Sequence, residues 1–95
     1  MAGCGTITTR AELDTWLIAT LTVTWHNQIS VTNGTKFADP YPTGPGMDGA
    51  AVMSLGHSMG AAFNVNCGTQ FAVTDFFGCA KVSDMGDVLA KGLGL

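Results

Sequence analysis

Charged side chains are scarce in this 95-residue chain: they make up 12% of it, about half of the usual share in a soluble domain. The four basic residues do not cluster, which excludes a surface that neutralises a nucleic-acid backbone. No apolar run approaches the roughly 20 residues of a membrane-spanning helix, and no basic stretch followed by an apolar core indicates a signal peptide. Neither nucleic acid nor a membrane span is therefore expected.

Cysteine is also scarce, with three residues, Cys4, Cys67 and Cys79, at irregular spacing. An odd number at such spacing does not predict a disulfide framework. The two histidines, His26 and His57, do not complete a recognisable zinc-ligand spacing, so no metal is expected. We therefore expect reduced, partly buried thiols in an intracellular, reducing compartment, the cytoplasm.

Apolar residues are not lacking, because they form 46% of the chain, which is enough to fold. Ninety-five residues allow one domain with a single modest core. The small, glycine-containing start indicates a tail or linker over residues 1–7. We expect one domain over residues 8–92, ended by glycines, and a short tail over residues 93–95.

Helical signals begin at Thr9, which together with Glu12 has the form of a capping box. Apolar residues then recur at helical spacing, which predicts a first helix from Arg10 to Trp25. A long loop is expected over residues 28–45, because this stretch holds all three prolines and an Asn-Gly turn signal. The apolar anchors expected to hold this loop on the core are Ile29 and Phe37.

A second helix is expected over residues 49–63, with Asp48 as its N-cap. Gly56 and Gly60 inside it each cost about 1 kcal/mol relative to alanine, so this helix must depend on packing. The remaining expected elements are a turn over residues 64–68, a short helix within residues 71–77 and a last helix capped by Ser83.

This order of elements resembles the acyl and peptidyl carrier protein family, most closely the carrier domains of polyketide synthases. The family brings an isoleucine and then Phe-x-Asp before a Gly-Leu-Asp-Ser motif, and Ile29, Phe37-Ala38-Asp39 and Gly46-Met47-Asp48 fill these places. The apolar positions five, seven and eleven residues after the motif aspartate are Met53, Leu55 and Met59. The resemblance covers about residues 8–92. It implies an all-α four-helix bundle with a long loop after the first helix and a short third helix.

Two departures from the family pattern bear on function. The loop before Asp48 is longer than usual, with residues 40–44 as the insertion, and Gly49 stands in place of the motif serine. In the family that serine hydroxyl holds 4′-phosphopantetheine, so the site as written cannot be loaded and no cofactor is expected. Ser54 and Ser58 lie five and nine residues beyond Gly49, away from the helix start where the family presents its attachment point.

Carrier proteins usually present an acidic second helix to basic partners, but residues 49–63 contain no Asp or Glu. The resemblance therefore implies a non-enzymatic, arm-less carrier-like domain that docks to other domains or enzymes of a polyketide or fatty-acid synthase. An alternative is a conventional acyl carrier protein with an engineered Ser-to-Gly change at Gly49. The expected partner-docking surface comprises Met47, Asp48, Gly49, Met53, Ser54 and His57.

A second motif indicates a different class of protein. Residues 56–60 read Gly-His-Ser-Met-Gly, which matches the nucleophile elbow of α/β-hydrolases and thioesterases, with Ser58 as the nucleophile. That reading needs residues 50–55 to form a buried strand and needs a histidine after the acid of the triad. No histidine follows Ser58, so a serine hydrolase would require this chain to be a fragment of a longer enzyme.

Overall fold

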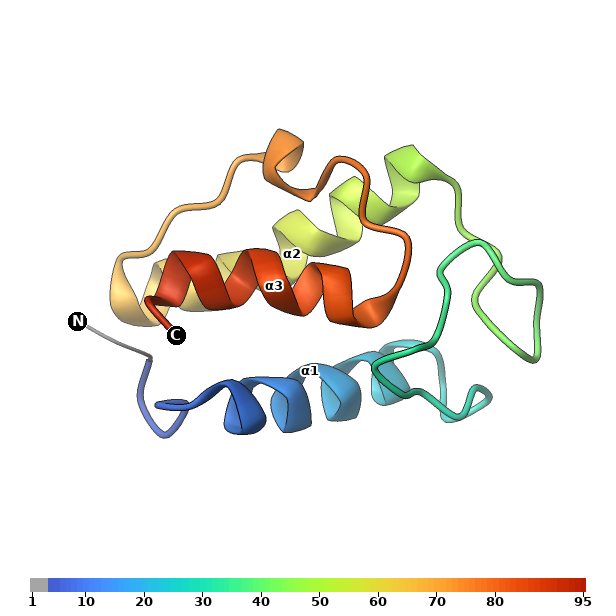
Figure 1. Ribbon diagram of the computed structural model, residues 1–95, viewed down its shortest axis with the longest axis horizontal. Coiled ribbons are helices and arrows are strands. Elements are labelled where there is room, and N and C mark those ends of the chain that lie inside the picture. Colours follow the sequence, from blue (N-terminus) through green and yellow to red (C-terminus); the bar gives the residue numbers. More distant parts are fainter. Residues whose placement is uncertain (1–3) are drawn as a thin grey trace.

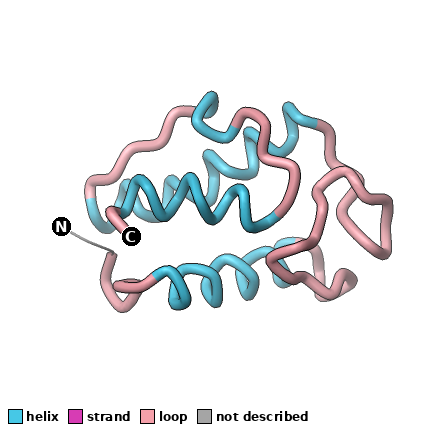
Figure 2. Tube along the Cα trace, in the orientation of Figure 1, coloured by secondary structure: helices cyan, strands magenta, loops and turns pink. Residues whose placement is uncertain are grey.

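The computed structural model describes residues 4–95; residues 1–3, the first part of the expected tail, lie outside the described residues. The elements in chain order are α1 (Arg10–Thr24), α2 (Gly49–Cys67), a 3-10 helix η1 (Val73–Phe76) and α3 (Val82–Leu93). Residues 4–95 contain only two isolated bridges and no strand, so the all-α prediction is confirmed. Four helices were expected, whereas the described residues form three α-helices and one 3-10 helix (Figures 1 and 2).

The three α-helices lie lengthwise along the molecule, with α2 and α3 running in the direction opposite to α1 (Figure 1). The long loop between α1 and α2 occupies one end of the molecule, while the described start of the chain and the C-terminus lie at the other end (Figure 1). Helix α3 packs against α1, and η1 packs against α2 and α3. The helices enclose one apolar core, whose fully buried large side chains are Leu13, Leu17, Leu21, Phe37, Phe76, Val82, Met85, Leu89 and Leu93.

Helix α1 has the predicted bounds to within one residue, because Trp25 is its C-cap. At its start the Thr9 hydroxyl accepts a hydrogen bond from the Glu12 N–H at 3.2 Å. The Glu12 carboxylate reaches back one residue further than a capping box requires and accepts from the N–H of Thr8 at 3.0 Å and from its hydroxyl at 2.8 Å. The first of these bonds satisfies an N–H group that the first helical turn leaves free, and the other two fix Thr8, the residue before the N-cap.

Helix α2 is four residues longer than predicted, and the expected turn over residues 64–68 is wrong for residues 64–67. The helix ends only at Gly68, which has φ +70°, a left-handed conformation that glycine adopts without steric cost. The two glycines inside α2 face aromatic rings: a Cβ on Gly56 would overlap the ring of Phe76, and one on Gly60 would lie 2.6 Å from the Phe71 ring. Packing of these rings compensates for the weak helix propensity of glycine, as the sequence required.

The last helix does not start as predicted. Lys81 is the N-cap of α3, and Ser83 lies inside its first turn. The capping function belongs to Asp84, whose carboxylate accepts from the N–H groups of Ala80 at 2.9 Å and Lys81 at 3.1 Å. The Ser83 N–H donates instead to the carbonyl of Asn33 in the long loop, at 2.9 Å. A tertiary contact therefore replaces the local cap that the sequence indicated.

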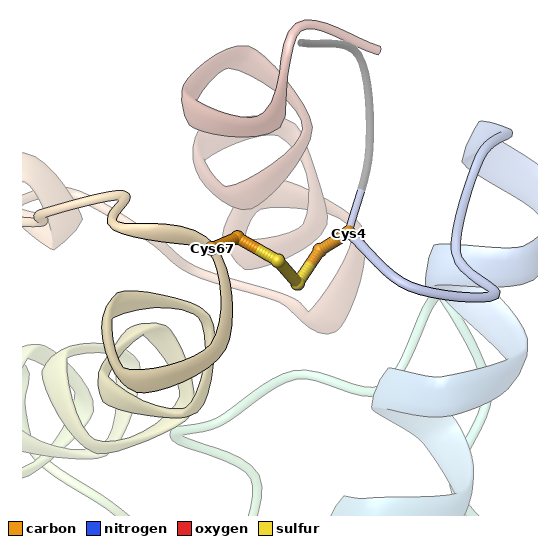
Figure 3. Close-up of a disulfide and its surroundings, with 2 residues drawn as sticks. All are labelled: Cys4 and Cys67. Carbon is orange, nitrogen blue, oxygen red and sulfur yellow. A yellow bond between two sulfur atoms is a disulfide. The ribbon is translucent and has the colours of Figure 1, made fainter.

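The start of the described chain contradicts the expectation of reduced thiols. Cys4 and Cys67 form a disulfide that ties the N-terminal segment to the last turn of α2 (Figure 3). Cys4 and Ile7 are both buried, so residues 4–7 belong to the packed unit although a tail was expected there. Cys79 is the one free cysteine among the described residues, and it is half-buried. The sequence did not predict this bridge because residues 63 positions apart meet only after folding.

Candidate functional site

The start of α2 is held by Asp48, as predicted. The Asp48 carboxylate accepts a hydrogen bond from the Ala51 N–H at 2.8 Å, and its carbonyl accepts from the Val52 N–H at 3.0 Å. Gly49 is therefore the first residue of α2, and it is exposed. Apart from its chain neighbours and the nearby backbone of α2 itself, a Cβ built on Gly49 would have no heavy atom within 4 Å. Any side chain at this position would stand in open solvent at a helix N-terminus.

The long loop places this helix start against the core. Phe37 is 1% exposed, its carbonyl accepts from the Met47 N–H at 2.7 Å, and its ring lies edge-on to Trp25 at 6.3 Å. Ile29 is 5% exposed, so both predicted loop anchors are buried, and Phe37 is part of the apolar core cluster. These contacts fix Met47, and with it the Asp48 cap, at a defined point beside the bundle.

Residues 40–44, which were expected to be an insertion, form a short loop that closes on itself. The Pro40 carbonyl accepts from the N–H groups of Thr43 at 3.0 Å and Gly44 at 3.1 Å, and the Asp39 carbonyl accepts from the Gly46 N–H at 2.8 Å. The chain therefore leaves and returns beside Asp39. Because this short loop closes on itself, the additional length does not disturb the contact between Phe37 and Met47.

The six residues of the expected docking surface lie at the start of α2 and along it. Asp48, Gly49, Ser54 and His57 are exposed, while Met47 and Met53 are half-buried and pack against the core. Gly49, Met53 and His57 follow at intervals of four residues, so they share one face of the helix. His57 also borders a hollow of about 210 Å³, together with Asn64, Gln70 and Phe71. The structure brings this set together on a surface that offers one imidazole and one carboxylate.

Chemistry at this surface is limited by the groups present. Gly49 has no hydroxyl, so the residues at the start of α2 do not fit a phosphodiester-linked phosphopantetheine arm. Ser54 and Ser58 are exposed but lie within the continuous helix α2. Residues 50–55, which a nucleophile elbow needs as a strand, are helical as well. Ser58 is therefore presented on the middle of a helix and not on a strand-to-helix turn.

The cations and carboxylates of this chain lie outside α2. Arg10 joins α1 to α3, because it donates to Asp14 at 2.9 Å, to Asp87 at 2.8 Å and to the Ser83 carbonyl at 3.2 Å. The hydrogen bond with Asp14 raises the pKa of Arg10, against a smaller lowering by burial. Burial raises the pKa of the Cys79 thiol, with further increases from Asp84 and Asp87, so this thiol is not activated as a nucleophile.

Over residues 4–95, no three His, Cys, Asp or Glu side chains gather closely enough to hold a metal ion. Within the same part of the chain, every helix is too short or too polar to cross a membrane. Comparison of the chain with protein-family models, curated proteins and solved structures finds no match. The site must therefore be interpreted from its own geometry.

Proposed function

We propose that this chain is an arm-less carrier-like domain of a polyketide or fatty-acid synthase system and acts as a structural or docking element. The proposal rests chiefly on the start of α2. A carrier protein presents its serine directly after the motif aspartate, and here the capping Asp48 is followed by Gly49 in open solvent. The position has the accessibility of an attachment site but lacks the hydroxyl that would hold an acyl arm.

The finer fold assignment is part of this proposal. We match α1, α2, η1 and α3 to the four helices of a carrier bundle, with η1 as its short third helix. The looped-out insertion supports the match, because it leaves Phe37 and Met47 in direct hydrogen-bond contact as if the intervening residues were absent. No residue is assigned a catalytic role. The Ser58 alternative receives no support from a histidine base or a supporting sheet in the described chain.

Docking through α2 would not depend on charge. From Gly49 to Cys67 the helix has no Lys, Arg, Asp or Glu, so partner contact there must use shape, apolar area and hydrogen bonds. The partners proposed are other domains or enzymes of the synthase. Such partners work in the cytoplasm, so we propose the same location for this domain. The Cys4–Cys67 disulfide, in contrast, is a feature typical of proteins in oxidising compartments.

The test is an intact-mass measurement with coenzyme A and a broad-specificity phosphopantetheinyl transferase. We expect the parent protein to stay unmodified and the Gly49→Ser variant to gain one phosphopantetheine arm. The added side chain starts in open space, because apart from the chain neighbours and the nearby backbone of α2 no heavy atom lies within 4 Å of a Cβ at this position. The matched control is Gly49→Ala, which adds the Cβ without the hydroxyl and should stay unmodified.

Two outcomes would contradict the proposal. Modification of the parent would mean that another hydroxyl, such as Ser54, accepts the arm. An unmodified Gly49→Ser variant that keeps the helical circular dichroism spectrum of the parent would mean that the α2 start is not recognised as a carrier site.

A further inference from the structure

Two lysines far apart in the sequence lie opposite each other where the long loop meets the start of α3. The Phe37 N–H donates to the Ala80 carbonyl and the Val82 N–H to the Thr35 carbonyl, each at 3.0 Å. These two bonds enclose an antiparallel bridge between Lys36 and Lys81 (the loop runs beside the start of α3 in Figure 1). Such a bridge is a non-hydrogen-bonded pair, in which the Cα atoms are about 4.5 Å apart and the side chains lie on the same face.

In the described chain, neither lysine side chain of this pair forms an ion pair; the nearby Asp84 carboxylate accepts from the backbone N–H groups of Ala80 and Lys81. Opposed like charges in an antiparallel pair are destabilising, and both lysine side chains are exposed. In the described chain, the ion pairs are those that Arg10 makes with Asp14 and Asp87. Of the four basic residues in the sequence, two are thus held side by side, and neither forms an ion pair within the described residues. A negatively charged group bound beside the two lysines would offset the repulsion between them.

The surroundings of the pair favour a macromolecular anion over a small one. The N–H groups of residues 80–83, which could cradle a phosphate, are all engaged. Two donate to the carboxylate of Asp84 and two to carbonyls of residues 33–35. Lysine is a point charge without the bidentate fork of arginine, so the pair alone does not enclose a small anion. The two positive charges of the lysine pair are therefore complementary to an extended acidic surface of a protein.

An exposed aromatic residue, Phe77, lies on the segment that leads to Lys81. Phe77 is 81% exposed, whereas its neighbour Phe76 is fully buried. Phe77 precedes Lys81 by four residues, so their Cα atoms are at most about 14 Å apart, the extended length of that segment. Both positions fit under one protein–protein interface of standard size. An exposed aromatic ring and two exposed cations within this span have the composition of an interface anchor with a charged rim.

We propose that Lys36, Phe77 and Lys81 form a docking surface for an acidic protein partner. The partner presents carboxylates to the two ammonium groups and an apolar pocket to the Phe77 ring. The inference goes beyond the carrier-like role, because it uses no residue of the α2 site. It can hold or fail whatever the Gly49→Ser variant does in the transferase assay.

The test is an NMR titration of the isotope-labelled protein with a six-residue peptide, leucine and tryptophan flanked by two glutamates on each side. We expect saturable amide shifts confined to residues 35–37 and 77–82. The dissociation constant should rise about five-fold in K36Q/K81Q and in F77A, from the loss of two exposed charge contacts or of one apolar anchor. Lys91→Gln is the matched control: it removes another exposed lysine of α3 and should leave the affinity unchanged.

Four results would overturn the proposal. These are the absence of saturable shifts at millimolar peptide, an equal loss of affinity in Lys91→Gln, equal binding of a peptide with lysines in place of the glutamates, and equal or tighter binding of tripolyphosphate at the same amides. The last result would define a small-anion site. Because the substituted side chains are exposed, an unchanged amide spectrum elsewhere confirms that each variant is folded.

Discussion

At the residue scale, glycine has opposite consequences at two positions of the same helix. Gly49 leaves an open surface where a side chain would fit, while Gly56 leaves a recess that the buried Phe76 ring fills. Phe71 occupies a similar place between Gly60 of α2 and Gly92 of α3, because a Cβ at either glycine would overlap its ring. The glycines that weaken α2 as an isolated helix are therefore the residues that let the aromatic rings approach its backbone.

This reasoning predicts that Gly56→Ala destabilises the protein by about 1–2 kcal/mol. Alanine improves helix propensity by about 1 kcal/mol, but overpacking a filled site costs about 1–3 kcal/mol. The cost here belongs to the upper part of that range, about 2–3 kcal/mol, because the new Cβ overlaps the Phe76 ring and the buried ring has no exposed space to move into. Urea unfolding followed by circular dichroism measures the difference. Gly49→Ala is the control, with no loss expected. A Gly56→Ala variant as stable as the parent would show that the ring can yield without cost.

At the element scale, each helix begins where side chains or carbonyls cap its free N–H groups. The capping groups of α1 and α2 are close in the sequence to the N–H groups they bind, whereas some of those at the start of α3 are distant. Thr9 and Asp48 bond to N–H groups three residues ahead, which is why both helix starts could be predicted. The start of α3 depends on Asp84 and on carbonyls of the long loop, so local pattern misplaced its cap at Ser83. The starts of α1 and α2 are therefore determined by local sequence, whereas the start of α3 also depends on tertiary contacts.

The cap of α1 predicts a pH dependence. Hydrogen bonds from the Thr8 hydroxyl and N–H lower the pKa of Glu12 below its ordinary value of 4.5. A carboxyl whose pKa is lowered by folding stabilises the folded state above its unfolded pKa, and this contribution is lost as the pH falls through the folded pKa. We expect Glu12→Gln to lower the melting temperature at pH 7, and the difference from the parent to shrink between about pH 5 and about pH 3. An equal difference at both ends of this range would contradict the assignment.

At the scale of the whole molecule, the disulfide closes most of the chain into one loop. Cys4 and Cys67 are 63 residues apart, and the bridge holds the N-terminal segment over the end of α2 (Figure 3). Cys4 and Ile7 complete the core at this end, beside the contact between Trp16 and Phe63, whose ring centroids are 4.8 Å apart. The bridge thus joins two distant parts of the sequence around one end of the core.

We predict that replacing both bridged cysteines, Cys4→Ser with Cys67→Ser, lowers the free energy of unfolding by about 4 kcal/mol. The estimate follows from the loop-closure entropy that a bridge of this span removes from the unfolded state. Urea unfolding with and without a dithiol measures it: the parent should lose stability on reduction and the double variant should not respond. Cys79→Ser, which removes the free thiol, is the control. A parent insensitive to the dithiol would contradict the prediction.

The amino-acid sequence by itself determined the all-α class, the bounds of α1, the cap and start of α2, the long loop with its anchors Ile29 and Phe37, and the missing hydroxyl at Gly49. These features depend on residues within about one helical turn of each other or on a side chain's own chemistry. Only the tertiary structure decided three further features. They are the Cys4–Cys67 bridge, the aromatic rings seated on the glycines of α2 and α3, and the opposition of Lys36 and Lys81. Each of these features brings together residues that are distant in the chain. Periodicity and capping patterns depend on neighbouring residues only, so they cannot predict which distant residues come into contact.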